Sequence, residues 1–142
     1  MHSISKRSLG YAVVVAAVAL LGKPAPAEAD RGCTLRSVRG DFGYEVTGTN
    51  LAVGLVSAVG RVNADGNGTL VGADTLSVSG TILRRQITGA YTLEEDCTGT
   101  VLFTDDLGQS TNLDFVLVDK GDELRFIQTD PDTIITGNAR RL

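Results

Sequence analysis

The sequence predicts an all-β fold, an eight-stranded antiparallel up-and-down barrel. Short runs rich in Val, Ile, Thr, Phe and Tyr are separated by Gly, Asp and Asn roughly every 8–12 residues, which is typical of sandwiches and barrels. No stretch keeps a helical period, and most connections are short enough for hairpins. Consecutive hairpins produce a meander, and closing eight such strands leaves no strand edge exposed.

The strand boundaries follow from the turn residues, because Gly, Asn, Asp and Pro favour tight turns. The eight expected strands span residues 38–48, 53–63, 69–78, 81–92, 99–104, 111–118, 123–129 and 133–140.

Turn positions in the C-terminal half also predict which residues face each other. A two-residue turn at Lys120-Gly121 sets Phe115 opposite Phe126. A turn at Pro131-Asp132 then sets Phe126 opposite Gly137. The apolar partners fall on one face of each hairpin, as expected of a sheet with one buried side.

The hairpin at Ser79-Gly80 predicts a charged pair on a mostly apolar face. Its register sets Asp74 opposite Arg85, and Tyr91 lies on the same face. Three interpretations stay open: an exposed or rim pair, a buried structural ion pair, or a pair that orients a ligand. Asp74, Arg85 and Tyr91 are therefore the candidate site residues.

Tyrosines supply the other candidate polar groups of the interior. Tyr44 alternates with Phe42 and Val46, so Tyr44 and Tyr91 can each place a hydroxyl inside a barrel or pack as core residues with satisfied hydroxyls. The strand at 53–63 does not reveal which of its faces points inward.

The N-terminal residues 1–29 have the pattern of a secretory signal sequence. Basic residues at 6–7 precede the apolar run Leu9–Leu21, which is shorter than the roughly 20 residues of a membrane-spanning helix. Small residues then allow cleavage after Ala27 or after Ala29, the second being preferred. The barrel domain would be residues 30–142 of an exported protein, periplasmic or secreted; an uncleaved anchor is the alternative.

Cleavage changes the chemistry available to the chain. It removes Lys6, Arg7, Lys23 and Glu28, which takes the formal net charge from −4 to −6, and it removes the single histidine, His2. Without histidine, a Ser-His-Asp or Cys-His centre and the usual catalytic zinc sites are excluded. The acidic balance argues against nucleic acid as a partner. We expect no cofactor, no metal and, after cleavage, no membrane partner.

The two cysteines predict one structural disulfide. An even number of cysteines in an exported chain favours a bridge, and Cys33 and Cys97 permit one pairing. A redox-active pair is the alternative, but the chain has no Cys-x-x-Cys motif.

Several motifs resemble a known group of barrels. They are the run Gly43–Asn50, Val59-Gly60-Arg61 with Asp65–Gly68, Asp96–Thr100 and Arg125–Pro131. Together they are similar to small exported bacterial proteins of the allene oxide cyclase-like (calycin-like) group. The resemblance implies an eight-stranded antiparallel barrel, and its better-known relatives are cyclases with a largely apolar lumen. No functional residue of those relatives matches a position here.

Two functional hypotheses follow. In the first, the barrel binds a small apolar molecule in its lumen; if it is an enzyme, it is a cofactor-free cyclase or isomerase. In the second, it is a non-catalytic structural or interaction protein of the periplasm or cell exterior, which predicts a lumen without a cavity. The sequence does not predict the ligand or the oligomeric state.

Overall fold

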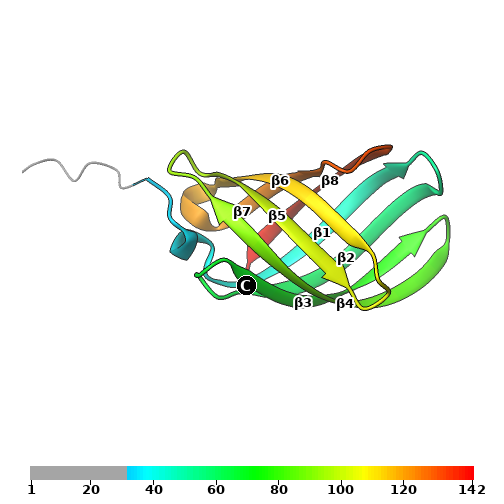
Figure 1. Ribbon diagram of the computed structural model, residues 1–142, viewed down its shortest axis with the longest axis horizontal. Coiled ribbons are helices and arrows are strands. Elements are labelled where there is room, and N and C mark those ends of the chain that lie inside the picture. Colours follow the sequence, from blue (N-terminus) through cyan, green and yellow to red (C-terminus); the bar gives the residue numbers. More distant parts are fainter. Residues whose placement is uncertain (1–31) are drawn as a thin grey trace, which may run out of the picture.

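Eight antiparallel strands, joined in sequence order, close into a barrel (Figure 1). The computed structural model describes residues 32–142, so the predicted signal sequence lies outside the described residues. The strands are β1 (Gly40–Asn50), β2 (Gly54–Ala64), β3 (Thr69–Val78), β4 (Thr81–Leu93), β5 (Thr98–Asp105), β6 (Ser110–Val118), β7 (Glu123–Gln128) and β8 (Thr133–Arg141). Two short 3₁₀ helices accompany them, η1 (Leu35–Val38) and η2 (Asp119–Gly121). In the described part of the chain, no helix is long and apolar enough to span a membrane.

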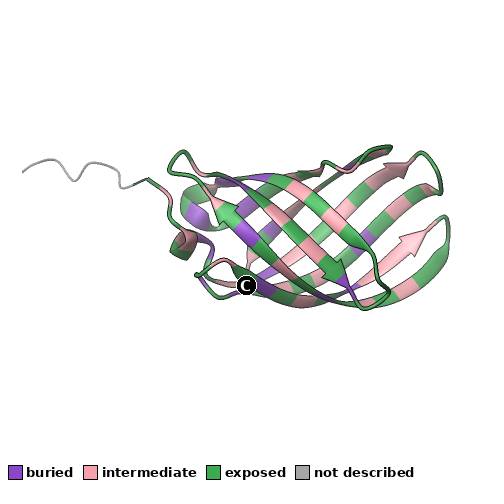
Figure 2. Ribbon diagram, viewed as in Figure 1, coloured by how far each residue is buried: buried purple, intermediate pink, exposed green. Residues whose placement is uncertain are grey.

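The predicted fold class is confirmed, with strand ends within a few residues of those expected. β8 pairs with β1 as well as with β7, and this pairing closes the barrel. Along most strands, exposed residues alternate with buried or half-buried ones (Figure 2). This pattern is expected when successive side chains of a strand point alternately into a closed barrel and out to solvent.

The inward face of β2, left open by the sequence, is the one with smaller side chains. Ala58 is buried and Val56 and Val62 line the interior, whereas Leu55 and Val59 are exposed. Small inward residues on this strand leave more space in the lumen.

The predicted registers are confirmed. Phe115 faces Phe126, and Phe126 faces Gly137. The predicted two-residue turn at Lys120-Gly121 is wrong in length, because the ladder ends one pair earlier. The connection runs from Asp119 to Asp122, as η2 and a helical cap closed by a hydrogen bond from the Asp122 N–H to the Asp119 carbonyl (3.1 Å).

The two ends of the barrel differ. At one end lie η1, the C-terminus and the β2–β3, β4–β5 and β6–β7 connections; the other four connections surround the opposite end (Figure 1). The tightest core fills the first end, where Val38 of η1 is buried among apolar side chains of the strands. The buried members of this cluster are Val38, Phe42, Ala64, Leu70, Tyr91, Phe115, Leu117, Leu124 and Ala139.

Two further contacts hold the closed end together. The predicted disulfide is confirmed: Cys33, just before η1, is bonded to Cys97 in the β4–β5 connection. The Arg141 guanidinium lies over the Phe42 ring, with 4.6 Å from Cζ to the ring centroid. It also donates hydrogen bonds to the carbonyls of Arg39, Ser37 and Gly121. The interior is therefore sealed at this end.

Candidate functional site

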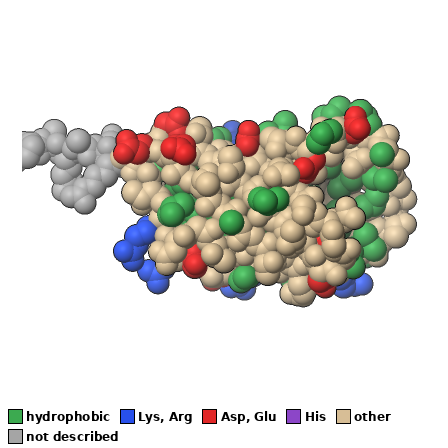
Figure 3. Space-filling model, in the orientation of Figure 1, with side chains coloured by type: hydrophobic (Ala, Val, Ile, Leu, Met, Phe, Trp, Pro, Cys, Tyr) green, Lys and Arg blue, Asp and Glu red, His purple; other side chains and the backbone are tan. Residues whose placement is uncertain are grey.

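A cavity of about 650 Å³ occupies the barrel interior between the closed core and the opposite end. Its wall is mostly apolar and includes residues of the connections at the open end, such as Val53 and Leu107. Exposed hydrophobic side chains gather around that end (Figure 3). Small-molecule sites commonly have volumes of roughly 300–1,000 Å³ and apolar walls with a few placed polar groups.

The central polar feature of the wall is an ion pair across β3 and β4. Asp74 faces Arg85 in the β3–β4 ladder, as the turn at Ser79-Gly80 predicts. Arg85 Nε donates to Asp74 Oδ1 (2.9 Å), and Nη2 donates to Asp74 Oδ2 (2.5 Å). These two parallel bonds are the strong, geometrically specific form of an arginine–carboxylate contact.

A second carboxylate binds the same guanidinium. Arg85 Nη1 donates to Asp105 Oδ2 at 3.1 Å. Asp105 ends β5, and its Oδ1 accepts the backbone N–H groups of Leu107 (2.9 Å) and Gln109 (3.0 Å). The side chains of Asp74 and Asp105 are 0% and 1% exposed, and that of Arg85 is 10% exposed. The exposed or rim interpretation of the Asp74–Arg85 pair is therefore wrong.

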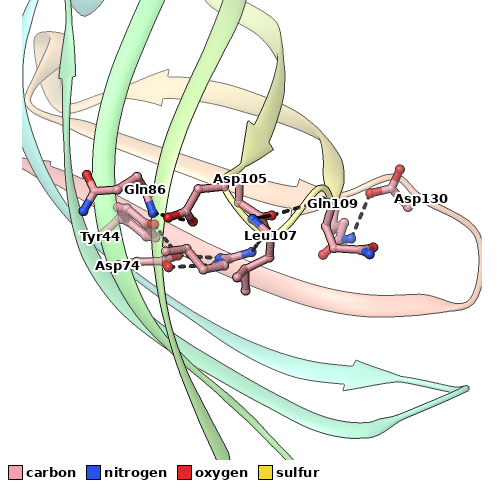
Figure 4. A network of polar contacts seen from close by, with 10 residues as sticks. Tyr44, Asp74, Gln86, Asp105, Leu107, Gln109 and Asp130 are labelled. Atoms are coloured by element: carbon pink, nitrogen blue, oxygen red, sulfur yellow. Dashed lines mark hydrogen bonds and ion pairs between the residues drawn. The ribbon is translucent and has the colours of Figure 1, made fainter.

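Tyr44 completes the cluster from the first strand. Its hydroxyl donates to Asp74 Oδ2 at 2.6 Å, so side chains from β1 and β4 meet on the Asp74 carboxylate of β3 (Figure 4). Gly60 of β2 lies between them in the sheet, opposite both Tyr44 and Asp74. A Cβ at Gly60 would come within 2.5 Å of the Asp74 Cβ and 2.9 Å of a Tyr44 ring carbon. The glycine thus makes room for the tyrosine–aspartate contact.

Burial sets the protonation of this cluster. Removal from water, followed by the hydrogen bond to Asp74, raises the pKa of Tyr44 well above its usual range, so the phenol stays neutral. Burial acts to lower the pKa of Arg85, but the hydrogen bond and negative charge of Asp74, together with the hydrogen bond to Asp105, outweigh it and raise the pKa. The cluster therefore holds one guanidinium cation beside a neutral phenol.

Tyr91, the third candidate, lies apart from this cluster. Its hydroxyl donates to the Leu35 carbonyl of η1 at 3.1 Å, and its side chain belongs to the closed-end core. Among the three candidates, Asp74 and Arg85 come together and Tyr91 does not join them.

The sequence patterns did not predict Asp105 as a site residue. They predicted Tyr44 as a possible interior hydroxyl but did not predict its hydrogen-bond partner. The pairing of β4 with β5 sets Ile87 opposite Asp105, but the long connection between these strands leaves no two-residue turn from which to count the register. One signal was available: Asp105 starts an Asp-Asp-Leu-Gly turn, whose first position favours an aspartate that binds following N–H groups.

A second polar group, Asp130, lies near the open end, in the β7–β8 connection. Asp130 accepts hydrogen bonds from Gln128 Nε2 (2.8 Å), from Asn112 Nδ2 (2.8 Å) and from the Asn112 N–H (3.0 Å). Burial acts to raise the pKa of Asp130, but these donors lower it further than burial raises it.

The carboxylates of this cluster are engaged with Arg85 and with backbone N–H groups. Within residues 32–142, no three His, Cys, Asp or Glu side chains are grouped as metal ligands. Asp74 and Asp105 both bind Arg85, so their oxygens are already engaged. The cluster of Tyr44, Asp74, Arg85 and Asp105 is therefore a polar site held in place within a mostly apolar cavity.

Comparison with known proteins supports the fold alone. No family model and no curated protein matches the sequence. Three solved structures share the barrel: a redesigned β-barrel, mFAP1, bound to DFHBI (TM-score 0.57, 15% identity, 76% of this chain and 98% of that chain); a related redesign, mFAP0, bound to DFHBI (0.55, 15%, 74% and 99%); and EF1p2_mFAP2b bound to DFHBI (0.56, 10%, 78% and 100%). The allene oxide cyclase-like resemblance has no support from these comparisons.

Proposed function

We propose that this protein is an exported barrel that binds one small, mostly apolar molecule in its lumen. The observation that carries the proposal is the cavity of about 650 Å³, sealed by the η1 core at one end and walled by apolar side chains. Burying an apolar ligand there removes its surface from water, which contributes a favourable free energy of roughly 25 cal/mol per Å² of apolar surface. The alternative, a non-catalytic structural or interaction protein, predicts a lumen without a cavity, and the cavity therefore favours ligand binding over it.

The similar barrels agree with this reading. The three solved structures are each bound to the small molecule DFHBI. A barrel of eight strands has an interior wide enough for one small ligand.

Export is the second part of the proposal. The disulfide between Cys33 and Cys97 suits an oxidising compartment. The basic start, apolar run and small-residue cleavage sites of residues 1–29 supply the matching targeting signal. Pulse-labelling in a secreting host tests this part, with a processed form beginning at residue 28 or 30 as the expected result.

Blocking the lumen tests the binding proposal. Leu83 lines the cavity, whereas its neighbour Ile82 points outward and is 53% exposed. The uncharged dye N-phenyl-1-naphthylamine, which brightens in apolar surroundings, should bind the protein at one site. Leu83→Trp should weaken its binding at least about tenfold, because the indole fills the lumen, and Ile82→Trp should leave it unchanged. Absence of dye binding, or equal binding by the two variants, contradicts the proposal.

A cofactor-free isomerase or cyclase is the second candidate, favoured by one observation. Arg85 places fixed N–H donors in an apolar chamber, and the Tyr44–Asp74 hydrogen bond adds a fixed dipole; such an environment can stabilise charge as it develops on a reacting molecule. Native mass spectrometry of protein from its own host should first reveal the retained molecule. Incubating that molecule with fresh protein then distinguishes the candidates: an isomerase yields a product of equal mass and different retention time, whereas a binding protein returns it unaltered.

A further inference from the structure

The Arg85 guanidinium has hydrogen-bond donors that the protein does not use. A guanidinium carries five N–H groups. Asp74 and Asp105 accept three of them, one from each nitrogen. One N–H on Nη1 and one on Nη2 therefore have no partner among residues 32–142. Arg85 lines the cavity, and its side chain is only 10% exposed, so water has limited access to it.

We propose that these two N–H groups bind an uncharged oxygen acceptor of the ligand, such as the carbonyl of a ketone or ester. The inference rests on the proposed lumen binding and adds the chemical class of the ligand. A carbonyl oxygen has two lone pairs and can accept both N–H groups, and buried donors left without an acceptor cost free energy. An apolar molecule with a carbonyl would satisfy them.

The charges of the wall argue against an anionic ligand. Arg85 is the one basic side chain among the described residues that line the cavity, and it already binds two carboxylates. Asp130 adds a third acidic group near the open end. A carboxylate or phosphate ligand would bring another negative charge into a lumen that is already net negative, where repulsion is poorly screened. A neutral acceptor avoids this penalty.

The guanidinium is held in place before any ligand arrives. Asp74 binds it from β3, and Asp105 is itself fixed by two backbone N–H groups. The Phe103 ring lies 5.8 Å from Arg85 Cζ, close enough for a cation–π contact. Binding a ligand oxygen would therefore order few additional groups, which favours affinity and selectivity.

Three matched naphthalene probes test the inference on the unmodified protein. They are the ketone 6-propionyl-2-(dimethylamino)naphthalene, the parent 2-(dimethylamino)naphthalene without a carbonyl, and the carboxylate 6-(dimethylamino)-2-naphthoate. The ketone should bind at least about tenfold more tightly than the parent, and the carboxylate more weakly than the ketone. The infrared carbonyl stretch of the bound, ¹³C-labelled ketone should shift to lower frequency than in a hydrocarbon solvent.

Arg85→Lys is the matched variant. An ammonium keeps the positive charge beside Asp74 and Asp105 but has only three N–H donors. Those carboxylates accept three N–H groups from Arg85, so a lysine that satisfies them has no donor left for the ligand. The ketone should lose its advantage over the parent, and its carbonyl shift should disappear. Thermal unfolding of the variant checks that the barrel is intact; because the probe series is measured on the unmodified protein, the test stands without the variant.

The possible outcomes distinguish a failure of carbonyl recognition by Arg85 from a failure of lumen binding itself. If neither the ketone nor the parent binds, lumen binding of apolar molecules is wrong. If both bind equally and the carbonyl stretch matches that in hydrocarbon, lumen binding stands and the assignment to Arg85 is overturned. Tightest binding by the carboxylate also overturns it.

Discussion

Asp74 and Arg85 lie directly opposite each other on β3 and β4, and two parallel hydrogen bonds join them inside the barrel. Taking such charges out of water is costly. The pair is tolerated because the guanidinium binds the carboxylates of both Asp74 and Asp105. Replacing only one partner should therefore harm the protein far more than replacing all of them.

Arg85→Met should destabilise the barrel strongly. It leaves Asp74 and Asp105, whose side chains are almost fully buried, without their cation. Breaking a buried pair in this way costs about 3–5 kcal/mol of unfolding free energy. Urea unfolding at pH 7 measures the loss.

The control replaces the partners together. In Asp74→Leu/Arg85→Met/Asp105→Asn no charge remains in the cluster, and an amide oxygen at position 105 can still accept the N–H groups of Leu107 and Gln109. This triple variant should recover most of the stability that Arg85→Met loses. If it is no more stable than the single variant, the uncompensated charge is not the cause.

The sequence predicted the Asp74–Arg85 contact because a two-residue hairpin permits counting: once Ser79-Gly80 is the turn, every pair of the ladder follows. The fold class followed for the same reason, from a succession of short hairpins. The predicted disulfide needed no geometry, since two cysteines allow one pairing.

The registers that bring the rest of the cluster together could not be counted from a two-residue turn. Tyr44 is 30 residues from Asp74, and Asp105 is 20 residues from Arg85; longer connections or an intervening strand separate them. The burial of the Asp74–Arg85 pair, in contrast, follows from closure of the barrel, since in an open sheet the same register would allow an exposed pair.

Gly60→Ala should disrupt the cluster without touching its polar atoms. The added methyl would meet the Asp74 Cβ at 2.5 Å and the Ala73 carbonyl oxygen at 2.6 Å, and the carbonyl belongs to backbone that cannot move freely. Overpacking of this kind costs about 1–3 kcal/mol. Gly43→Ala on β1 is the control, because its methyl would meet only the Leu142 side chain, at 3.3 Å. Equal unfolding midpoints for the two variants would contradict the packing role of Gly60.

The protein should lose stability as the pH rises above about 10, because the stabilising contribution of Tyr44 is lost there. In the unfolded chain a tyrosine ionises near its ordinary value of 10.0, whereas burial and Asp74 keep Tyr44 protonated in the fold. The folded state then holds one more proton, so the unfolding free energy falls by up to about 1.4 kcal/mol per pH unit, and below pH 10 the contribution is fully present.

Tyr44→Phe isolates this effect. Unfolding free energies of both proteins are measured by urea titration from pH 8 to pH 11, and the difference between them should shrink above pH 10. Tyr11 and Tyr91 are common to both proteins, so their titration cancels. A constant difference across the range would mean that Tyr44 does not keep its proton in the folded state.

The Cys33–Cys97 disulfide should contribute stability chiefly by restraining the unfolded chain. It links residues 64 positions apart, and closing a loop of that size is worth about 4 kcal/mol in the chain-entropy description. Cys33→Ser/Cys97→Ser should lower the unfolding free energy by roughly that amount and leave dye binding in the lumen intact, because Tyr91 still binds the Leu35 carbonyl of η1. A loss of dye binding at temperatures where the variant is folded would instead assign the disulfide to sealing the cavity.

Arg141 should matter far more than its neighbour Arg140, although both are arginines at the end of β8. Arg141 lies over Phe42 and donates to carbonyls of Ser37 and Gly121 at 3.1 and 2.9 Å, so it joins η1, η2 and β1 at the closed end. Arg141→Met leaves these carbonyls without a donor and should cost about 2 kcal/mol. Arg140 is 72% exposed, and its ion-pair partner Glu123 keeps a second arginine, Arg125, so Arg140→Met should cost less than about 1 kcal/mol. Hydrogen exchange gives a second readout: the amides of Val38 and Phe42 should exchange faster in Arg141→Met alone, and equal exchange in both variants would show that Arg141 does not hold this end closed.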